Sequence, residues 1–379
     1  MNSKVIPFSD IKNMSKKCEI TFIIGNGFDL GLGMKTKYTD VYDGYVKSPS
    51  SSDFIARFKK ELKAKEANNY EKKAKEANNY EKWSDFEMGM ASYARTLETE
   101  NELIECVRDF KRFMVDHLKK ENTRIMERLV HYQSKHEFYK ECDRSLNKFY
   151  DGLIPNDITQ IKSIIGENDI IRNYITFNYT TSLEALFSII SRGRSVRENT
   201  PIHIHGKLGE DVVLGVDNPD QLMGTKYDIT KKVERAFIKT RFNKQFDNAR
   251  VENAEKAIIN SSIICVYGFS MGESDNTWVR LLSDWLLNDK KHHLVFYQHS
   301  APVIDPYNYD EIMDIEDELN LELLKKLQIA DNSVLEQIHI PVGKKLFKFS
   351  FQEIVPHTLK ESTEFNSSDT YENKTFAMK

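Results

Sequence analysis

Cysteine, long apolar runs and an excess of either charge are all scarce in this sequence, and each shortage excludes a class of protein. The 379 residues include only four cysteines, which lie far apart and form no C-x-x-C pair. A structural zinc module and a dithiol redox site are therefore not indicated, and we expect buried thiols. No run approaches the roughly 20 apolar residues of a membrane-spanning helix. The first ten residues also lack the apolar core of a signal peptide, so we expect a cytoplasmic protein with no membrane partner.

The balance of charge bears on nucleic-acid binding. The 54 basic and 58 acidic residues give a net charge of −4, and no arginine-rich patch stands out. Because proteins bind the phosphate backbone with clustered lysine and arginine, a nuclease is disfavoured from the start. The hydrophobic fraction of 40% argues against a largely disordered chain and is enough for a substantial core.

A glycine-rich turn follows the first apolar run. Residues 21–24 (TFII) read as a buried strand that stops at Gly25-Asn26-Gly27, and a helix is expected to begin near Phe28. Without a β-carbon, Gly25 and Gly27 let a phosphate approach the backbone, with their N–H groups pointing at the anion. Because the third glycine of G-x-G-x-x-G is missing, the turn predicts nucleotide binding only together with later segments.

A helical block follows the first strand. Apolar residues spaced by three or four positions indicate one long amphipathic helix: Leu103, Val107, Phe110, Met114 and Leu118. Within the block, residues 63–72 are repeated unchanged as residues 73–82. Because ten helical residues rotate by about 1000°, the two copies cannot present the same side chains to one surface. We expect an exposed helix or a mobile connection there, away from the active centre.

Beyond residue 153 the pattern becomes that of an α/β protein. Strand-like runs cover residues 158–165, 169–179, 202–206, 262–268 and 293–298, and helical patterns cover residues 228–259, 276–288 and 309–327. The alternation predicts a Rossmann-like α/β fold with a mostly parallel sheet and a large helical insertion. We expect a nucleotide-binding core at 1–45 and 160–350, the insertion or cap at 46–159, and a disordered tail at 361–379.

An asparagine follows the second buried strand. Asn178 lies just past the run that contains Thr176, and open α/β sheets bind ligands at the carboxyl ends of their strands. The amide of Asn178 is therefore a candidate ligand contact. The alternative is that the amide only fixes the turn.

Two histidines lie in the segment PIHIHGK. His203 and His205 are two residues apart on an expected strand, so both side chains would share one face, and Gly206 would let the chain turn at once. Three interpretations stay open: acid–base catalysis by a histidine, metal ligation by an H-x-H pair, or two hydrogen-bonded histidines, one of them in the core.

A further strand, glycine turn and helix occur near residue 268. Gly268 and Ser270 suit a second phosphate or ribose contact. Asp275 would either accept hydrogen bonds from sugar hydroxyls or cap the helix that begins at Asn276.

Taken together, these segments resemble the bacterial AbiH family of phage abortive-infection proteins over most of residues 20–300. The resemblance rests on five elements: GNGFD, a W-x-D-x-E element at residues 83–87, TFNYT, HIHGK and YGFSMGESD. That family is similar in turn to the sirtuin-like NAD-binding fold. The resemblance implies a phosphate turn, a ribose contact at Asn178 and an acid–base residue at His205. It makes Gly25, Asn26 and Gly27 the phosphate turn, and Gly268 with Ser270 the second phosphate and ribose contact. We also expect Asp29, Thr176 and Asp275 to contact the cofactor.

The chain also departs from the sirtuin pattern. Its cysteines cannot supply the four-cysteine zinc ribbon of sirtuin deacetylases, so protein deacetylation is not expected. Thr180 stands where sirtuins usually have an Asp, and Asp29 stands where many have a small hydroxyl residue. The closest functional comparison is the set of sirtuin-like defence effectors that hydrolyse NAD, for which an Asn and a His are essential.

We therefore expect an anti-phage effector that hydrolyses NAD+ to nicotinamide and ADP-ribose, with NAD as its substrate and no metal. Asn178 would orient the ribose hydroxyls or the attacking water, and His205 would accept a proton. Because nicotinamide leaves as a neutral molecule, few catalytic side chains are required.

Two other functions stay open. One is a sensor that binds a nucleotide or ADP-ribose without chemistry, and the other is a metal-dependent nuclease or phosphohydrolase that uses His203, His205 and Asp217. A phage component or a partner defence protein would supply the trigger, and a homo-oligomer is compatible with the sequence.

Overall fold

The computed structural model describes residues 17–73, 86–130, 132–185, 196–298 and 308–349. The predicted disordered tail at 361–379 and most of the second repeat copy lie outside these residues. The first copy, residues 63–72, lies within helix α4 (Asp53–Lys73). Within the described part, no helix is both long enough and apolar enough to cross a membrane.

The sheet is parallel throughout its paired strands. Its strands are β1 (Lys17–Ile24), β2 (Asp169–Thr176), β3 (Val196–Glu198), β4 (Ile202–His203), β5 (Ile263–Tyr267), β6 (His293–Tyr297) and β7 (Ile338–His339). Their order is β3-β2-β1-β5-β6-β7, and β4 also pairs with β2. Strands β2 and β3 are thus added on one side of β1, and β5, β6 and β7 are then added on its other side. This is the doubly wound, Rossmann-like order. The predicted fold class is confirmed.

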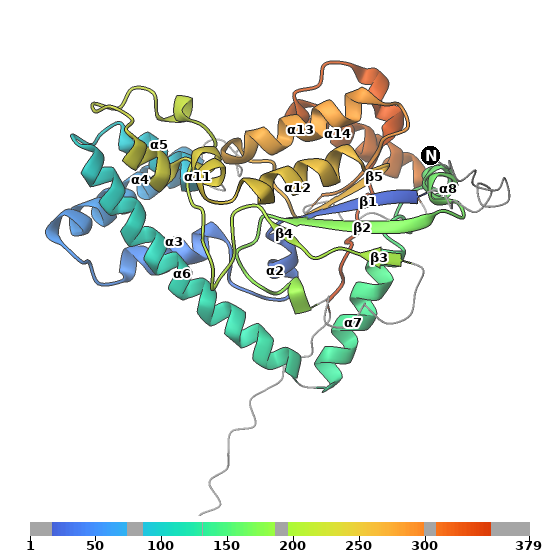
Figure 1. Cartoon of the computed structure of the whole chain (residues 1–379), viewed down its shortest axis with the longest axis horizontal. Helices are drawn as coiled ribbons and strands as arrows, with labels where there is room; N and C mark the ends of the chain where they lie inside the picture. The colour runs from blue at the N-terminus through green and yellow to red at the C-terminus, as the bar shows by residue number, and fades with distance from the viewer. Residues whose placement is uncertain (1–16, 74–85, 131, 186–195, 299–307, 350–379) are drawn as a thin grey trace, which may run out of the picture. The chain divides into compact units, whose positions relative to one another are not determined.

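One face of the sheet is mainly aliphatic. Because side chains alternate along a strand, Ile23, Ile175 and Val266 share this face and pack into one core. Three helices contribute to the same core: α12 (Asn248–Ile259), α13 (Asn276–Asn288) and α14 (Tyr309–Leu327). They lie together above the sheet in Figure 1. The predicted bounds of α13 and α14 are confirmed.

The opposite face is aromatic. Phe22 stacks on Tyr174 across β1 and β2, with ring centroids 5.5 Å apart, and meets Phe149 edge-on at 5.5 Å. Tyr297 closes this face from β6 because its hydroxyl donates to the carbonyl of Phe149 at 2.6 Å. Helix α2 (Gly27–Gly31) adds Phe28, which is fully buried.

The residues between β1 and β2 are mainly helical where the structure describes them. After α2 and before β2 come α3 (Tyr38–Lys47), α4, α5 (Phe86–Ala94), α6 (Glu100–Val130), α7 (Tyr132–Asn147) and α8 (Pro155–Ile165). The predicted apolar stripe of residues 103–118 lies on α6, and all five of its members are buried. Helices α3, α4, α5 and α6 share one core with residues 208–238, which follow β4 in the chain. The division into a core and an insertion remains a prediction.

Two predicted elements differ from the structure. The strand expected over residues 158–165 is wrong, because these residues belong to α8, where Pro155 occupies the first turn and favours a helical start. The helical stretch expected over 228–259 divides into α10 (Lys231–Phe237), α11 (Lys239–Phe246) and α12. Ile238 interrupts it with an extended backbone, and Asp247 caps α12 by accepting from the Arg250 N–H at 3.1 Å.

Candidate active site

Four strand ends lie level at one edge of the sheet. The register pairs Ile24 with both Thr176 and Tyr267, and it pairs Thr176 with His203. The segments that follow β1, β2, β4 and β5 therefore lie side by side, at the carboxyl edge where open α/β sheets bind ligands. Every site residue predicted from the sequence lies at this edge or in these segments.

The two glycine turns pack directly against each other. Gly25 N donates to the Tyr267 carbonyl at 2.9 Å, and Gly27 N donates to the Gly268 carbonyl at 3.2 Å. A β-carbon on Gly25 would lie 2.3 Å from the Gly268 oxygen, and one on Gly27 would lie 2.5 Å from Gly268 Cα. The expectation that these N–H groups point at an anion is therefore wrong. The glycines allow close backbone approach, and α2, with five residues, is too short for a strong dipole.

The polar side chains after β1 are held internally. Asn26 exchanges two hydrogen bonds with Thr36, accepting from its hydroxyl at 2.6 Å and donating to its carbonyl at 2.9 Å. Asp29 is 1% exposed and accepts from the hydroxyls of Thr180 (2.6 Å) and Ser182. Burial raises the pKa of Asp29 to about 6, although the two hydroxyls oppose this shift. Asp29 thus ties the segment after β1 to the segment after β2.

Asn178 is buried with a free amide nitrogen. The turn after β2 is fixed by Thr176, whose hydroxyl accepts from Asn178 N at 3.1 Å. The Asn178 carbonyl lies 2.9 Å from His203 Nδ1. The side chain is 6% exposed, and its Nδ2 has no hydrogen-bond partner among the described residues. Since buried polar groups are normally paired, this donor is available to a ligand.

The two histidines contact different partners. Strand β4 ends at His203, earlier than predicted, so the expected shared face does not form. His203 Nε2 lies 2.8 Å from Glu184 Oε1. His205 is 4% exposed, and its Nε2 lies 3.0 Å from Asp275 Oδ1. Both ring nitrogens are buried and neither meets hydrogen-bond geometry within the described part of the chain, so the contact of Nε2 with Asp275 is a close approach to a carboxylate rather than a hydrogen bond.

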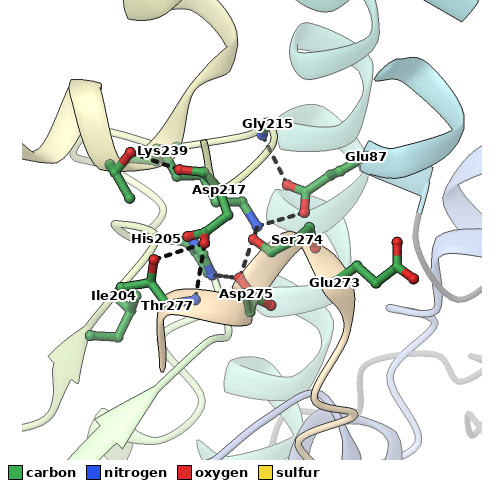
Figure 2. Close-up of polar contacts among 12 residues, drawn as sticks. Glu87, Ile204, His205, Gly215, Asp217, Lys239, Glu273, Ser274, Asp275 and Thr277 are labelled. Atoms are coloured by element: carbon green, nitrogen blue, oxygen red, sulfur yellow. Dashed lines mark hydrogen bonds and ion pairs between the residues drawn. The ribbon is translucent and has the colours of Figure 1, made fainter. Parts of the chain in front are cut away.

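A row of buried charges runs through His205 (Figure 2). Asp275 Oδ1 also accepts from Lys239 Nζ at 2.9 Å, and Lys239 Nζ donates to Glu87 Oε2 at 2.6 Å and to the Ser274 carbonyl at 3.1 Å. The side chains of His205, Lys239 and Glu87 are each at most 5% exposed, and that of Asp275 is 15% exposed. Burial makes each of these charges dependent on its partners.

The row also sets the protonation of its members. Burial alone would raise the pKa of Asp275, but Lys239 and His205 hold it well below its usual range. Burial lowers the pKa of His205, and the charge of Lys239 lowers it further against the opposing effect of Asp275. His205 is therefore neutral at pH 7, with Nε2 beside the ionised Asp275 at 3.0 Å and Nδ1 without a hydrogen-bond partner among the described residues. This is the state that a general base requires.

Asp217, rather than Asp275, caps helix α13. One Asp217 oxygen accepts from Thr277 N at 2.9 Å and from Thr277 Oγ1 at 2.7 Å. Asp275 precedes α13 but makes no side-chain cap hydrogen bond. The capping explanation of Asp275 is therefore wrong, because its carboxylate points at Lys239 and His205 instead.

Aromatic rings surround His205. The ring of Phe177 lies 5.3 Å from the imidazole and stacks on Phe269 at 4.1 Å. The ring of Tyr179 lies 6.1 Å from the imidazole, measured between centroids. Phe177 follows β2 and Phe269 follows β5, so the apolar wall is built from both sides of β1. Such a wall excludes water from the imidazole and accounts for its low pKa.

The loop after β5 carries backbone strain. Gly268 has a φ of 66°, and Met271 has a φ of 56°, which is uncommon for a residue with a β-carbon. Ser270 lies between them and is exposed. Ser270 is thus accessible, whereas Gly268 is engaged by the turn after β1.

The described residues offer no cluster of side chains that would support a metal site. No group of three or more His, Cys, Asp or Glu side chains there is arranged to hold a metal ion. His203, His205 and Asp217 each contact a different partner, namely Glu184, Asp275 and Thr277.

Two members of the charge row were not assigned a role from the sequence. Lys239 lies in a charged helical stretch, where nothing distinguishes it from its neighbours. Glu87 belongs to the W-x-D-x-E element, whose first two named residues lie outside the described part. Only the fold shows that Glu87 is linked to His205: Glu87 pairs with Lys239, Lys239 pairs with Asp275, and Asp275 lies beside His205.

The strand order and the polar edge define a doubly wound α/β protein with a ligand-type site at the point where the strand order reverses. The chain belongs to the family described as Bacteriophage abortive infection AbiH, which its sequence matches over residues 21–297. It is therefore a protein of abortive-infection defence against phage. The match begins in β1 and ends in β6, so it includes the helices between β1 and β2. No curated protein matches the chain significantly.

Proposed function

We propose that this chain hydrolyses NAD+ to nicotinamide and ADP-ribose, and that the loss of NAD causes abortive infection. One observation carries the proposal. His205 and Asn178 are buried at the same edge of the sheet, and each has a side-chain nitrogen without a hydrogen-bond partner in the described residues. A base and an amide donor held in this way suit hydrolysis at a ribose carbon.

The proposed chemistry uses few groups. The C–N bond between the ribose and nicotinamide breaks, nicotinamide departs neutral with the bonding electrons, and positive charge develops on the ribose. Water then attacks the ribose carbon and loses a proton to Nδ1 of His205. Asp275 stabilises the imidazolium that forms, because its Oδ1 lies 3.0 Å from Nε2. The amide of Asn178 orients the ribose hydroxyls or the attacking water.

The contacts of Asp29 support a sirtuin-like site. Asp29 and Thr180 are the two positions at which the chain departs from the sirtuin pattern, and they are hydrogen-bonded to each other at 2.6 Å. We infer that the carboxylate and the hydroxyl of the sirtuin pattern are exchanged within this pair. Gly25 and Gly27 keep a role in closing the turns, and the proposal requires no phosphate contact from their N–H groups.

The test is nicotinamide release from NAD+ by the purified full chain. Asn178→Ala and His205→Ala should each abolish turnover while the circular dichroism spectrum stays unchanged. His293→Ala is the matched control, because His293 begins β6 at the other end of the sheet and burial lowers its pKa as well, to about 4. Undiminished turnover in both site variants contradicts the assignment.

The two alternatives give different results. Calorimetry that detects NAD or ADP-ribose binding to the unmodified chain without nicotinamide release would favour the sensor. Cleavage of nucleic acid or a nucleotide phosphate that stops on addition of a chelator would favour the metal-dependent enzyme.

A further inference from the structure

Helix α5, one of the helices between β1 and β2, supplies a charge to the site. Glu87 lies in the first turn of α5, and the residue is 2% exposed. One oxygen accepts from Gly215 N at 3.0 Å, and the other accepts from Lys239 at 2.6 Å. Glu87 therefore connects α5 both to the loop that carries Asp217 and to the charge row.

Lys239 divides its three protons among three acceptors. These acceptors are Glu87, Asp275 and the Ser274 carbonyl. An ammonium group that is 4% exposed cannot exchange a lost partner for water, so a change at Glu87 must alter its interaction with Asp275. Oδ1 of Asp275 in turn lies 3.0 Å from Nε2 of His205.

Other contacts seat α5 on the same loop. Arg95, which directly follows α5, donates to the carbonyls of Met223 at 3.0 Å and Gln221 at 3.3 Å. The Gln221 side chain lies 3.3 Å from the Met88 sulfur and donates to the Glu273 carbonyl at 2.9 Å. Helix α5 is thus joined to the loop that carries Gln221 and, through Gln221, to the segment that carries Glu273. Figure 2 shows the contacts of Glu87 with Gly215 and Lys239.

We propose that Glu87 is a positioning residue for His205: by sharing Lys239 with Asp275, it keeps the Asp275 carboxylate beside Nε2 of the imidazole. Any event that withdraws α5 removes this carboxylate and leaves Lys239 with Asp275 and the Ser274 carbonyl. The imidazole then loses part of its anchor. The state of the helical block is in this way transmitted to the site by a single buried cation. The role in catalysis rests on the proposed function, whereas the coupling to His205 does not.

The test measures the imidazole itself. The full chain is labelled with nitrogen-15 in histidine, and the His205 signals are assigned by their loss in His205→Gln. Glu87→Gln removes a negative charge, so the pKa of His205 should fall. Lys239→Met removes a positive charge, so the pKa should rise, with a larger protonated fraction at neutral pH. Arg250, Tyr179 and Asp217 also lie near this region, and all are unchanged in both variants.

Two further variants keep the result interpretable. Glu198→Gln is the matched control, because Glu198 is another acidic side chain with little exposure (9%), and it pairs with Arg172 of β2 at 2.8 Å. It should leave the His205 titration unchanged. If Lys239→Met fails to fold, the double variant Glu87→Gln/Lys239→Met takes its place. It removes one negative and one positive charge together, so no unpaired charge stays buried. The pKa of His205 in the double variant should be higher than the pKa of His205 in Glu87→Gln.

Turnover provides the second readout. Glu87→Gln should reduce kcat for NAD+ by roughly tenfold while KM stays near its original value, because a positioning defect acts on the reacting step. Absence of nicotinamide release by the unmodified chain would count against the proposed function and leave the nitrogen-15 comparison as the test of coupling. Titrations of His205 that match the unmodified chain in all charge-row variants, or that shift in one direction for both single variants, would overturn the inference.

Discussion

Thr180 donates a 2.6 Å hydrogen bond to Asp29 and thereby joins the segment after β2 to helix α2. Ser182 donates to the other carboxylate oxygen. The acid is 1% exposed, and no basic side chain is hydrogen-bonded to it among the described residues. Two hydroxyls solvate a buried carboxylate less well than water does, which explains why burial raises its pKa to about 6.

This raised pKa predicts a defined dependence of stability on pH. The folded pKa of Asp29 is about 6 and its ordinary value is 3.8, so the folded state binds the proton more tightly between these values. The contribution of Asp29 is fully present below about pH 4 and is lost as the pH rises through about 6, a change on the order of 3 kcal/mol. Asp29→Asn should remove this dependence.

Urea unfolding at several pH values checks the prediction for Asp29. The difference in unfolding free energy between the unmodified chain and Asp29→Asn should shift in favour of the variant as the pH rises from 4 to 7. Parallel curves for the two proteins would show that Asp29 does not carry the expected proton.

The contact between the two glycine turns predicts a steric cost. Gly27→Ala places a β-carbon 2.5 Å from Gly268 Cα, where backbone rather than a flexible side chain must move. The expected loss of stability is roughly 1–3 kcal/mol. Gly89→Ala is the control, because nothing lies within 4 Å of its added carbon and α5 should gain about 0.5–1 kcal/mol. Thermal unfolding of both variants decides the point, and equal midpoints would refute it.

Asp217 should stabilise helix α13 from outside the helix. Asp217→Ala removes the acceptor of Thr277 N and Oγ1 and should cost about 1–2 kcal/mol in unfolding free energy. Asp217→Asn retains one acceptor oxygen and should cost less. A urea-unfolding series of the two variants tests this order, and a larger loss in the Asn variant would contradict the capping role.

The pKa of His205 predicts the pH profile of NAD+ hydrolysis. Burial and the charge of Lys239 lower this pKa below its ordinary value of 6.5. A base must be unprotonated, so kcat/KM should stay level through neutral pH and decline only below pH 6.5. Initial rates of nicotinamide release across pH give the acid limb, and a limb above pH 7 would exclude His205 as the base.

Metal chelation distinguishes the proposed reaction from its metal-dependent alternative. Because the proposed steps use only protein groups, NAD+ hydrolysis should be unaffected by EDTA and should not increase when Mg2+ or Mn2+ is restored. A loss of activity in EDTA that a divalent cation reverses would favour the nuclease or phosphohydrolase.

Local patterns in the sequence predict much of this fold. The apolar run before Gly25 and the one before Gly268 are strands, and the stripe on α6 is buried as its spacing indicates. The convergence of the strand ends follows from the carboxyl-edge rule for parallel sheets. The boundary of β4 was missed because the short β4 pairing ends at His203, where the chain turns.

Long-range partners explain what the sequence does not reveal. The sequence around Gly25 predicts a phosphate-binding turn. A glycine that makes room for a ligand cannot be distinguished, from a single sequence, from a glycine that makes room for another backbone segment. Lys239 and Glu87 are separated by most of the helical block and β2, and their pairing has no local signature. The position of Asp275 before α13 predicts a helix cap, but in the structure Asp217 accepts the hydrogen bond from Thr277 N.

The register of the sheet has a consequence for synthesis on the ribosome. Phe22 in β1 pairs with Tyr174 and with Cys265, so the first strand is made long before either neighbour exists. His205 obtains its carboxylate only once Asp275 has been translated. Since nascent segments cannot form contacts with residues not yet made, a prematurely terminated chain lacks the assembled centre.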